Sequence, residues 1–282
     1  MSVANGLHHD GLLSPLRRCV TTVGAAIYLL LRPVRVRGEA RPLSWRALAI
    51  SAGIIVAAFL LCMSLVDAAV VRWVGTLPRT VPWLFDQITD YGKSAWFLWP
   101  LGILFVLLAG LPQSRLTRFS QLVLAAVMAR VGFLFLAIAV PGLFINILKR
   151  LVGRARPGVP GVIDPFAFHP FSWSAAYASL PSGHATTVLS VIVAFGSLWP
   201  RARTVLWIYA LLIMASRIAV TAHFPSDVLA GAVFGTLGAM LVRRYFALRR
   251  LVFSIDPNGG LHAWPGPSLK RIKAVARELL AP

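Results

Sequence analysis

Acidic side chains are scarce in this 282-residue chain: nine Asp and Glu stand against 28 Lys and Arg, and only 13% of the residues are charged. Soluble domains carry about 25% charged residues, so the composition excludes an ordinary soluble protein. With 58% hydrophobic residues and a mean hydropathy of +0.76, the chain is expected to be an integral membrane protein.

Cysteine is also scarce, since only Cys19 and Cys62 occur. Both lie in or beside apolar stretches without metal or redox spacing, so we expect free thiols and no disulfide framework. A catalytic metal site needs a cluster of acidic and histidine ligands, whereas Asp86, Asp90 and Asp164 are scattered and better explained by capping or loop folding. We therefore expect that the protein uses no metal and no other cofactor.

Long apolar stretches make up most of the remaining chain. A membrane-spanning helix needs about 20 apolar residues, and the last three of six candidate stretches reach that length only with flanking polar residues such as Ser182 to His184 and Ser226-Asp227. The candidates are 47–71, 94–111, 121–148, 185–200, 204–222 and 228–242. The expected fold class is all-α, a polytopic membrane protein with a six-transmembrane-helix bundle.

Three regions follow from this pattern. Residues 1–45 form a cytoplasmic N-terminal segment, in which 19–31 is too short to span and is interpreted as an interfacial helix, with a signal-peptide core as the alternative. Residues 46–243 form the six-span domain. Residues 244–282 form a basic cytoplasmic tail, with an amphipathic helix expected at 268–280.

The basic residues indicate orientation, because Lys and Arg accumulate in cytoplasmic loops. With both termini cytoplasmic, nineteen Lys and Arg fall inside and seven outside, while Arg130 and Arg217 fall within spans and Arg130 is expected to reach the inner interface. The charge then reflects topology and contact with anionic lipid of the cytoplasmic leaflet, and no nucleic acid partner is needed. Four of the seven outer charges crowd into 149–156 against this bias, which suggests a ligand. Nothing in the sequence indicates an oligomeric state.

Two motifs lie between the third and fourth stretches. "KRLVGRARP" gives Lys149 and, after six residues, Arg156-Pro157; alone it could be a basic cluster that contacts lipid headgroups. "PSGH", Pro181 to His184, could alone be a helix cap.

A third motif, "SRIAVTAHFPSD", gives Ser216-Arg217, His223 and Asp227 between the fifth and sixth stretches. An unpaired arginine within a span costs at least about 2.5 kcal/mol, so an anion should meet Arg217. Two crossings separate this loop from the first two motifs, so all three are expected on the outer face.

These three motifs, in this order and spacing, resemble the signature of the type 2 phosphatidic acid phosphatase superfamily. The resemblance covers about residues 47–242, including the six-span layout of its lipid-acting members. It implies a membrane lipid phosphate as substrate, a phosphohistidine intermediate and no metal. It also implies that the phosphate ligands are Lys149, Arg156, Ser182, Gly183 and Arg217, and that the catalytic residues are His223, Asp227 and His184.

The chemistry of the residues agrees with these roles. Phosphoryl transfer is catalysed mainly by positioning and by positive charge, which Lys149, Arg156 and Arg217 supply. Ser182 and the backbone N–H groups of Gly183 and His184 stand where a helix begins, a site that favours anions.

The two motif histidines divide the covalent work. We expect His223, held by Asp227 four residues later, to attack phosphorus, and His184 to protonate the leaving oxygen. Undecaprenyl diphosphate ranks first as substrate, because recycling that carrier is a general bacterial need outside the membrane. Phosphatidylglycerol phosphate and lipid A 1-phosphate are alternatives, as is phosphotransfer to another lipid.

Two further classes remain. A vanadium haloperoxidase would use a similar anion site, but six spans argue against it; a non-catalytic lipid-binding or transport protein would not require the full set of His223, Asp227 and His184. The aromatic-rich loop 158–180 is equally compatible with a lid and with a packed plug. The expected location is the inner membrane of a bacterium, with the site facing the periplasm.

Overall fold

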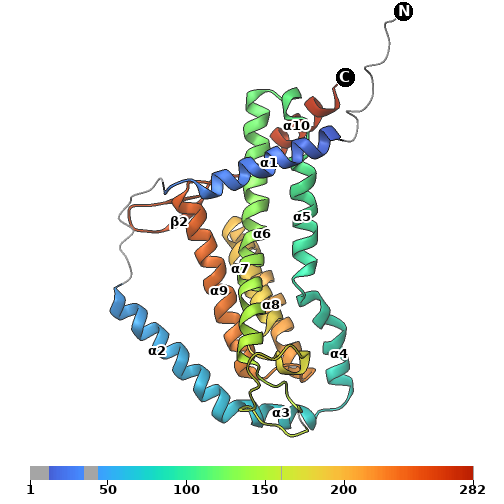
Figure 1. Ribbon diagram of the computed structural model, residues 1–282, viewed down its shortest axis with the longest axis vertical. Coiled ribbons are helices and arrows are strands. Elements are labelled where there is room, and N and C mark those ends of the chain that lie inside the picture. Colours follow the sequence, from blue (N-terminus) through green and yellow to red (C-terminus); the bar gives the residue numbers. More distant parts are fainter. Residues whose placement is uncertain (1–12, 35–43, 160, 282) are drawn as a thin grey trace, which may run out of the picture.

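The computed structural model describes residues 13–34, 44–159 and 161–281, so part of the expected N-terminal segment, residues 1–12 and 35–43, lies outside it. The described chain is a helical bundle, and its one sheet is a two-stranded hairpin. In Figure 1, α5 to α9 run roughly along the long axis, while α1 (Leu13–Leu31) crosses one end. The predicted all-α class is confirmed.

Among the described residues, five segments are long and apolar enough to cross a membrane. They are Trp45–Gly75, containing α2 (Trp45–Leu61) and α3 (Asp67–Gly75); Thr80–Ala109, containing α4 (Thr80–Thr89) and α5 (Ala95–Ala109); α6 (Arg118–Val152); Pro200–Ala219, containing α8 (Arg203–Ala219); and α9 (Pro225–Leu248). The sixth candidate, α7 (Gly183–Leu198), has 16 residues and is shorter than a typical span. The chain is thus a multi-pass membrane protein, and the count of six is not confirmed.

Helices α7 and α9 begin two to three residues before the predicted apolar stretches, so they include motif residues in their first turns. His184 lies in the first turn of α7, and Ser226 and Asp227 lie in the first turn of α9. The hydropathy pattern does not predict α4, which occupies the expected outer loop between the first two stretches and packs against α8. Its ten residues are too few to stand out as a separate hydrophobic stretch.

Close packing of α7 against α9 forms the centre of the bundle. Glycines on α9 allow this approach, because a Cβ at Gly231 would lie 2.4 Å from the carbonyl oxygen of Ser182, and one at Gly235 would lie 2.3 Å from that of Thr186. Small residues four apart let membrane helices meet at their backbones. The packing holds the first turns of α7 and α9 side by side, where Ser182 N donates to Asp227 O at 3.0 Å.

The end of the bundle that carries α1 also carries the C-terminal elements, namely β1 (Phe253–Ile255), β2 (Leu261–Ala263) and α10 (Leu269–Leu280) (Figure 1). Phe253 packs edge-on against Phe133 of α6 at 4.8 Å between ring centroids. Arg130, expected at the interface, donates to the carbonyl oxygens of Trp264 and Pro265 at 2.9 and 3.0 Å. The C-terminal residues therefore pack on the bundle, and α9 continues past the expected domain boundary at residue 243 to Leu248.

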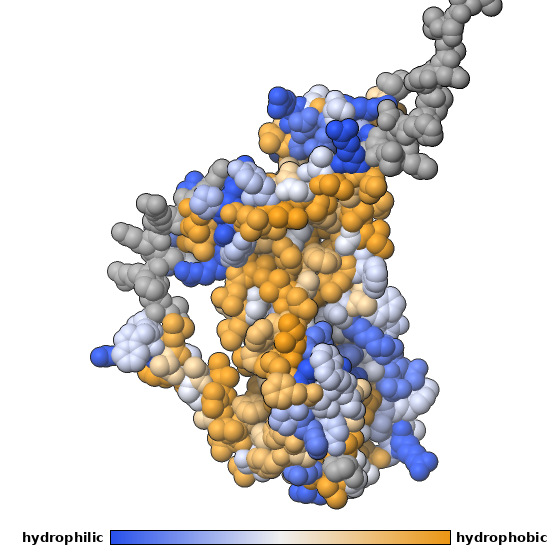
Figure 2. Space-filling model, in the orientation of Figure 1, coloured by the Kyte–Doolittle hydropathy of each residue, from blue (hydrophilic) through white to orange (hydrophobic). Residues whose placement is uncertain are grey.

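The amphipathic α10 forms as expected and is tied to the start of α6. The carboxylate of Glu278 accepts hydrogen bonds from Thr117 N at 3.0 Å and Ser120 Oγ at 2.8 Å. The face of the bundle drawn in Figure 2 is largely apolar over its middle, with polar surface toward its two ends, as expected for a chain that crosses a bilayer.

Candidate active site

The three motifs meet at the end of the bundle opposite α1 and α10 (Figure 1). Lys149 is in the last turn of α6, Arg217 is in the last turn of α8, and Asp227 is in the first turn of α9. The long loop 153–182 connects α6 to α7 across this end. The two motif-bearing loops thus lie on one face of the bundle, as the sequence predicts.

Gly153 turns the chain sharply into that loop. It ends α6 in the left-handed conformation, with φ of 63°, and a Cβ there would lie 1.7 Å from the backbone oxygen of His169. Only glycine fits this geometry. The loop folds back on itself through His169 N to Gly153 O at 2.7 Å and Ala155 N to Ala167 O at 2.9 Å, and this pairing fixes Arg154 and Arg156.

The first turn of α7 forms the centre of the site. Ser182 is its N-cap residue, but its side chain makes no capping hydrogen bond. The Lys149 ammonium lies beside this turn, 3.6 Å from where a Cβ of Gly183 would stand. A helix start with free N–H groups and an adjacent ammonium group favours an anion.

Several polar atoms of the site are buried without a protein partner among the described residues. They are Arg156 Nε, Ser182 Oγ, His184 Nε2 and Arg217 Nε. Buried polar groups are nearly always hydrogen-bonded, and these four come from all three motifs. An oxyanion such as a phosphate group fits this donor set.

Arg217 is 8% exposed, and its guanidinium is held from the side by α4, because Nη1 donates to Thr89 Oγ1. The turn that follows α8 brings His223 back toward it, since the backbone N of His223 donates to Arg217 O at 3.2 Å.

His223 faces Asp227 through an intervening hydroxyl. Its Nδ1 lies 3.4 Å from Ser179 Oγ, which donates to Asp227 Oδ2 at 2.6 Å. Asp227 Oδ2 itself is 3.8 Å from Nδ1, too far for a hydrogen bond. The sequence predicts a carboxylate holding the imidazole, and the structure puts Ser179 between the two.

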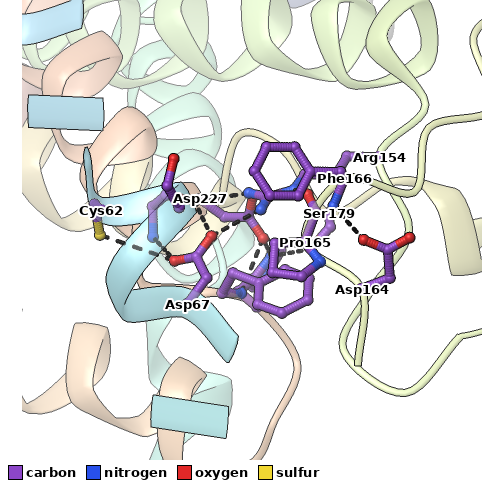
Figure 3. Close-up of polar contacts among 12 residues, drawn as sticks. Cys62, Asp67, Arg154, Asp164, Pro165, Phe166, Ser179 and Asp227 are labelled. Carbon is purple, nitrogen blue, oxygen red and sulfur yellow. Dashed lines mark hydrogen bonds and ion pairs between the residues drawn. The ribbon is translucent and has the colours of Figure 1, made fainter. Parts of the chain in front are cut away.

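Asp227 is fixed on its other side by an ion network, shown in Figure 3. Its Oδ1 accepts from Arg154 Nη1 at 2.5 Å, and Arg154 Nη2 donates to Asp67 Oδ2 at 2.7 Å. All three side chains are completely buried. They come from three distant segments: the start of α3, the loop 153–182 and the start of α9.

The sequence reading assigned no role to four residues that contact the motif side chains, namely Asp67, Thr89, Arg154 and Ser179. Asp67 did carry a signal, as the one charge within the first apolar stretch, and Arg154 lies inside the first motif. Nothing in the sequence distinguishes Thr89 and Ser179, because serine and threonine are common in loops and at helix ends.

Burial lowers the pKa of the His223 imidazole from its ordinary 6.5. The negative charge of Asp227 opposes this effect, and the positive charges of Arg217 and Arg156 add to it. Burial likewise lowers the pKa of the Arg156 guanidinium, which still stays charged at neutral pH. The His223 ring is therefore neutral, and so nucleophilic, at neutral pH.

A cavity of about 170 Å³ adjoins His184 on the side toward α5 and α6. Its polar lining comes from Lys93 and Ser94 before α5, Asn146 of α6, and Thr187 of α7. The cavity has room for part of a polar headgroup next to the His184 ring.

Two other titratable residues of the loop 153–182, Asp164 and His169, make structural contacts. Asp164 Oδ1 accepts from Phe166 N at 2.8 Å within a turn, and the His169 ring packs against Tyr177 at 4.8 Å. In the part of the chain that the structure describes, no group of three or more His, Cys, Asp or Glu could hold a metal ion.

Fold and site together define a multi-pass membrane protein whose helix ends bring together, at one end of the bundle, polar groups that fit a phosphate-type anion. Residues 130–251 match the model of the PAP2 superfamily. The chain belongs to this superfamily, so the predicted resemblance is confirmed, and the protein is a lipid phosphate hydrolase.

Three curated relatives are similar over much of their length. A lipid A 1-phosphatase of Rhizobium johnstonii is 35% identical, covering 79% of this chain and 88% of the relative. One of Rhizobium etli is 36% identical over 79% and 93%. A putative undecaprenyl-diphosphatase of Escherichia coli, YbjG, is 27% identical over 59% and 76%.

Two crystal structures are more distant. Aquifex aeolicus LpxE is 21% identical with a TM-score of 0.45, covering 64% of this chain and 95% of that one. A PAP2-type phosphatidylglycerolphosphate phosphatase from Bacillus subtilis is 18% identical with a TM-score of 0.45, covering 83% and 96%.

Proposed function

We propose that this protein removes the 1-phosphate of lipid A through a phosphohistidine intermediate on His223. The observation that carries the proposal is the convergence of Arg156, Ser182, His184 and Arg217, each with a buried polar atom free to bind an oxyanion. Lys149 adds a further positive charge beside the first turn of α7.

In the first step, the lone pair of His223 Nε2 forms a bond to phosphorus. The Nδ1 proton stays on the ring, directed to Ser179 Oγ, so the ring becomes cationic. The bond from phosphorus to the lipid oxygen breaks, its electron pair stays on that oxygen, and His184 gives it a proton. A bound phosphate dianion next to His184 favours the protonated ring required for this role.

In the second step, water attacks the phosphohistidine. The now neutral His184 takes a proton from the water, the new oxygen–phosphorus bond forms, and the nitrogen–phosphorus bond breaks with its pair returning to His223. Inorganic phosphate leaves. Arg156, Arg217 and Lys149 stabilise the charge on the three equatorial oxygens in both steps.

The cavity beside His184 is assigned to the leaving lipid headgroup. The acid must contact the leaving oxygen, so the headgroup belongs on the His184 side, where Lys93, Ser94 and Asn146 line the cavity. These polar side chains suit a hydroxylated headgroup.

The similarity to relatives revises the order of substrates. General bacterial need places undecaprenyl diphosphate first, but both relatives above 30% identity are lipid A 1-phosphatases. Undecaprenyl diphosphate stays as second candidate, since the 27% identical relative is a putative undecaprenyl-diphosphatase.

The orientation is proposed from the charges. Both termini are assigned to the cytoplasm and the site to the periplasmic side of the inner membrane, with the basic faces of the cytoplasmic segments, including α10, on anionic lipid. The lipid phosphate substrate enters from the outer leaflet in this arrangement.

Phosphate release by the purified protein tests the proposal. The protein in detergent with excess chelator is given lipid A, undecaprenyl diphosphate and phosphatidylglycerol phosphate at matched surface concentration. We expect release without metal, with the highest kcat/KM for lipid A, and none from His223→Ala.

A higher kcat/KM for undecaprenyl diphosphate would reverse the substrate order. Absence of release from all three lipids would favour lipid binding or transport. Labelled phosphate that appears on a second lipid instead of in water would favour phosphotransfer.

A further inference from the structure

Asp67 and Arg154 are charged, completely buried and outside the phosphate chemistry described above. A buried ion pair contributes little net stability, because desolvation offsets its attraction. A carboxylate within a spanning segment is therefore a candidate for a functional role.

Asp67 lies at a local distortion of the first spanning segment and has defined hydrogen-bond partners. A π-helical turn, Cys62–Val66, interrupts the first spanning segment directly before it, and such turns are frequent at functional sites. Asp67 Oδ1 then accepts from Ser226 N at 2.9 Å, and Oδ2 accepts from Arg154 Nη2 at 2.7 Å.

Arg154 connects this carboxylate to the site. Its Nε donates to Pro165 O at 2.9 Å, and its guanidinium carbon lies 4.6 Å from the centre of the Phe224 ring. Its Nη1 reaches Asp227 Oδ1 at 2.5 Å. Figure 3 shows the guanidinium between the two carboxylates.

The charges of this Asp67–Arg154–Asp227 network do not cancel. Two carboxylates and one guanidinium leave one negative charge, next to the Nδ1 side of His223. Without Asp67 the pair Arg154–Asp227 would be neutral, and the ring would experience little net stabilisation of positive charge.

We propose that Asp67 is a positioning residue for phosphoryl transfer: by neutralising Arg154, it leaves the charge of Asp227 available to stabilise the cationic His223 ring. The proposal rests on the proposed role of His223 as nucleophile. Asp67 itself contacts neither the ring nor the phosphate site; it acts through Arg154.

Other charged or titratable groups also act on the His223 ring. From the elements packed around it these are Arg217 of α8, Arg156 of the loop 153–182, His184 of α7 and Asp227 of α9. They are unchanged in every variant below, so differences between variants report on the Asp67–Arg154 pair.

The test compares Asp67→Asn with the double variant Asp67→Asn/Arg154→Met. The single variant makes the network neutral and so weakens the stabilisation of the cationic His223 ring. We expect kcat to fall about tenfold, because a loss of stabilisation equal to one pKa unit is a tenfold change. The acid limb of the kcat/KM pH profile should move to lower pH, because the His223 ring becomes harder to protonate. The double variant restores one negative charge and should recover both properties in part.

Ser64→Ala, on the same π-helical turn but with its hydroxyl donating to Leu60 O, is the matched control and should leave both properties unchanged. An Asp67→Asn variant with wild-type kcat and an unmoved acid limb would overturn the proposal. So would a double variant no better than the single one, since a purely structural role predicts further loss.

A second measurement does not depend on activity. The pKa of His223, followed by NMR with labelled histidine, should fall in Asp67→Asn and return toward the wild-type value in the double variant and in Asp67→Glu. Should Asp67→Asn not fold, the other two variants carry the test, and a His223 pKa displaced in both would refute the charge role. Absence of phosphate release by the wild-type protein would instead count against the proposed function.

Discussion

At the residue scale, the hydroxyl of Ser179 is the one direct side-chain link between His223 and Asp227 within the described residues. It accepts from the ring and donates to the carboxylate, at 3.4 and 2.6 Å. A single hydroxyl thereby favours the tautomer that leaves the lone pair on Nε2, which the proposed attack on phosphorus requires.

Ser179→Ala should therefore lower kcat about 10- to 100-fold, the factor that corresponds to hydrogen bonds involving charged groups. Ser190→Ala is the control, because Ser190 is a buried serine whose hydroxyl donates to Gly235 O at 3.2 Å inside the bundle. Steady-state kinetics in detergent measures both. Equal losses in the two variants would mean that the Ser179 hydroxyl acts only through packing.

The buried His223 ring also predicts a pH dependence of stability. Burial lowers its pKa in the folded protein, so below pH 6.5 the unfolded chain binds a proton that the folded one does not. Stability should then fall as the pH decreases from 6.5 toward the folded pKa. His223→Gln should flatten this part of the curve of unfolding midpoint against pH, and identical curves would contradict the burial effect.

The residues of the site illustrate how far the sequence leads. Three motifs, their placement at span ends and their resemblance to a family signature predict the site residues Lys149, Arg156, Ser182, Gly183, His184, Arg217, His223 and Asp227. The links through Ser179 and Thr89 depend on angles between helices and on the path of the loop 153–182. No local pattern encodes these.

At the scale of elements, the contact between α7 and α9 positions the residues of the proposed anion site. The two helices meet at Gly231 and Gly235, where a side chain would collide with the backbone of α7. This contact sets the distance between the Ser182 cap and Asp227.

Gly235→Val should lower the thermal unfolding midpoint by about 3–10 °C, as expected for overpacking of 1–3 kcal/mol, and should lower activity as well. Gly53→Val is the matched control on α2, since no atom beyond the surrounding helix backbone lies within 4 Å of a Cβ at Gly53. A midpoint for Gly235→Val equal to that of Gly53→Val would show that the two helices can separate without loss.

Element boundaries were harder to predict than element identity. The sequence located each spanning helix, but α7 and α9 begin with polar motif residues that hydropathy alone excludes. The hairpin of β1 and β2 was missed because its three-residue strands are stabilised by packing of Phe253 onto α6 and not by local propensity.

At the scale of the whole molecule, the site and the helices α1 and α10 lie at opposite ends of the bundle (Figure 1). The excess of basic residues predicts that α10 faces the cytoplasm and the site faces the periplasm. Trp173, 83% exposed in the loop 153–182, and Leu280, 84% exposed on α10, mark the two ends.

In a Cys19→Ala/Cys62→Ala background, Trp173→Cys should react with a membrane-impermeant maleimide in spheroplasts, whereas Leu280→Cys should react only after lysis. The comparison is matched because the two side chains are almost equally exposed. Labelling of Leu280→Cys alone in the intact spheroplasts would invert the proposed topology.

The central claim is that helix ends form a cationic pocket that delivers a phosphoryl group to His223. Rapid acid-free quenching of the protein with ³²P-labelled lipid phosphate tests it most directly. The account predicts an acid-labile, base-stable phosphoenzyme in the wild-type protein and none in His223→Ala; labelling of His223→Ala at the wild-type level would contradict it.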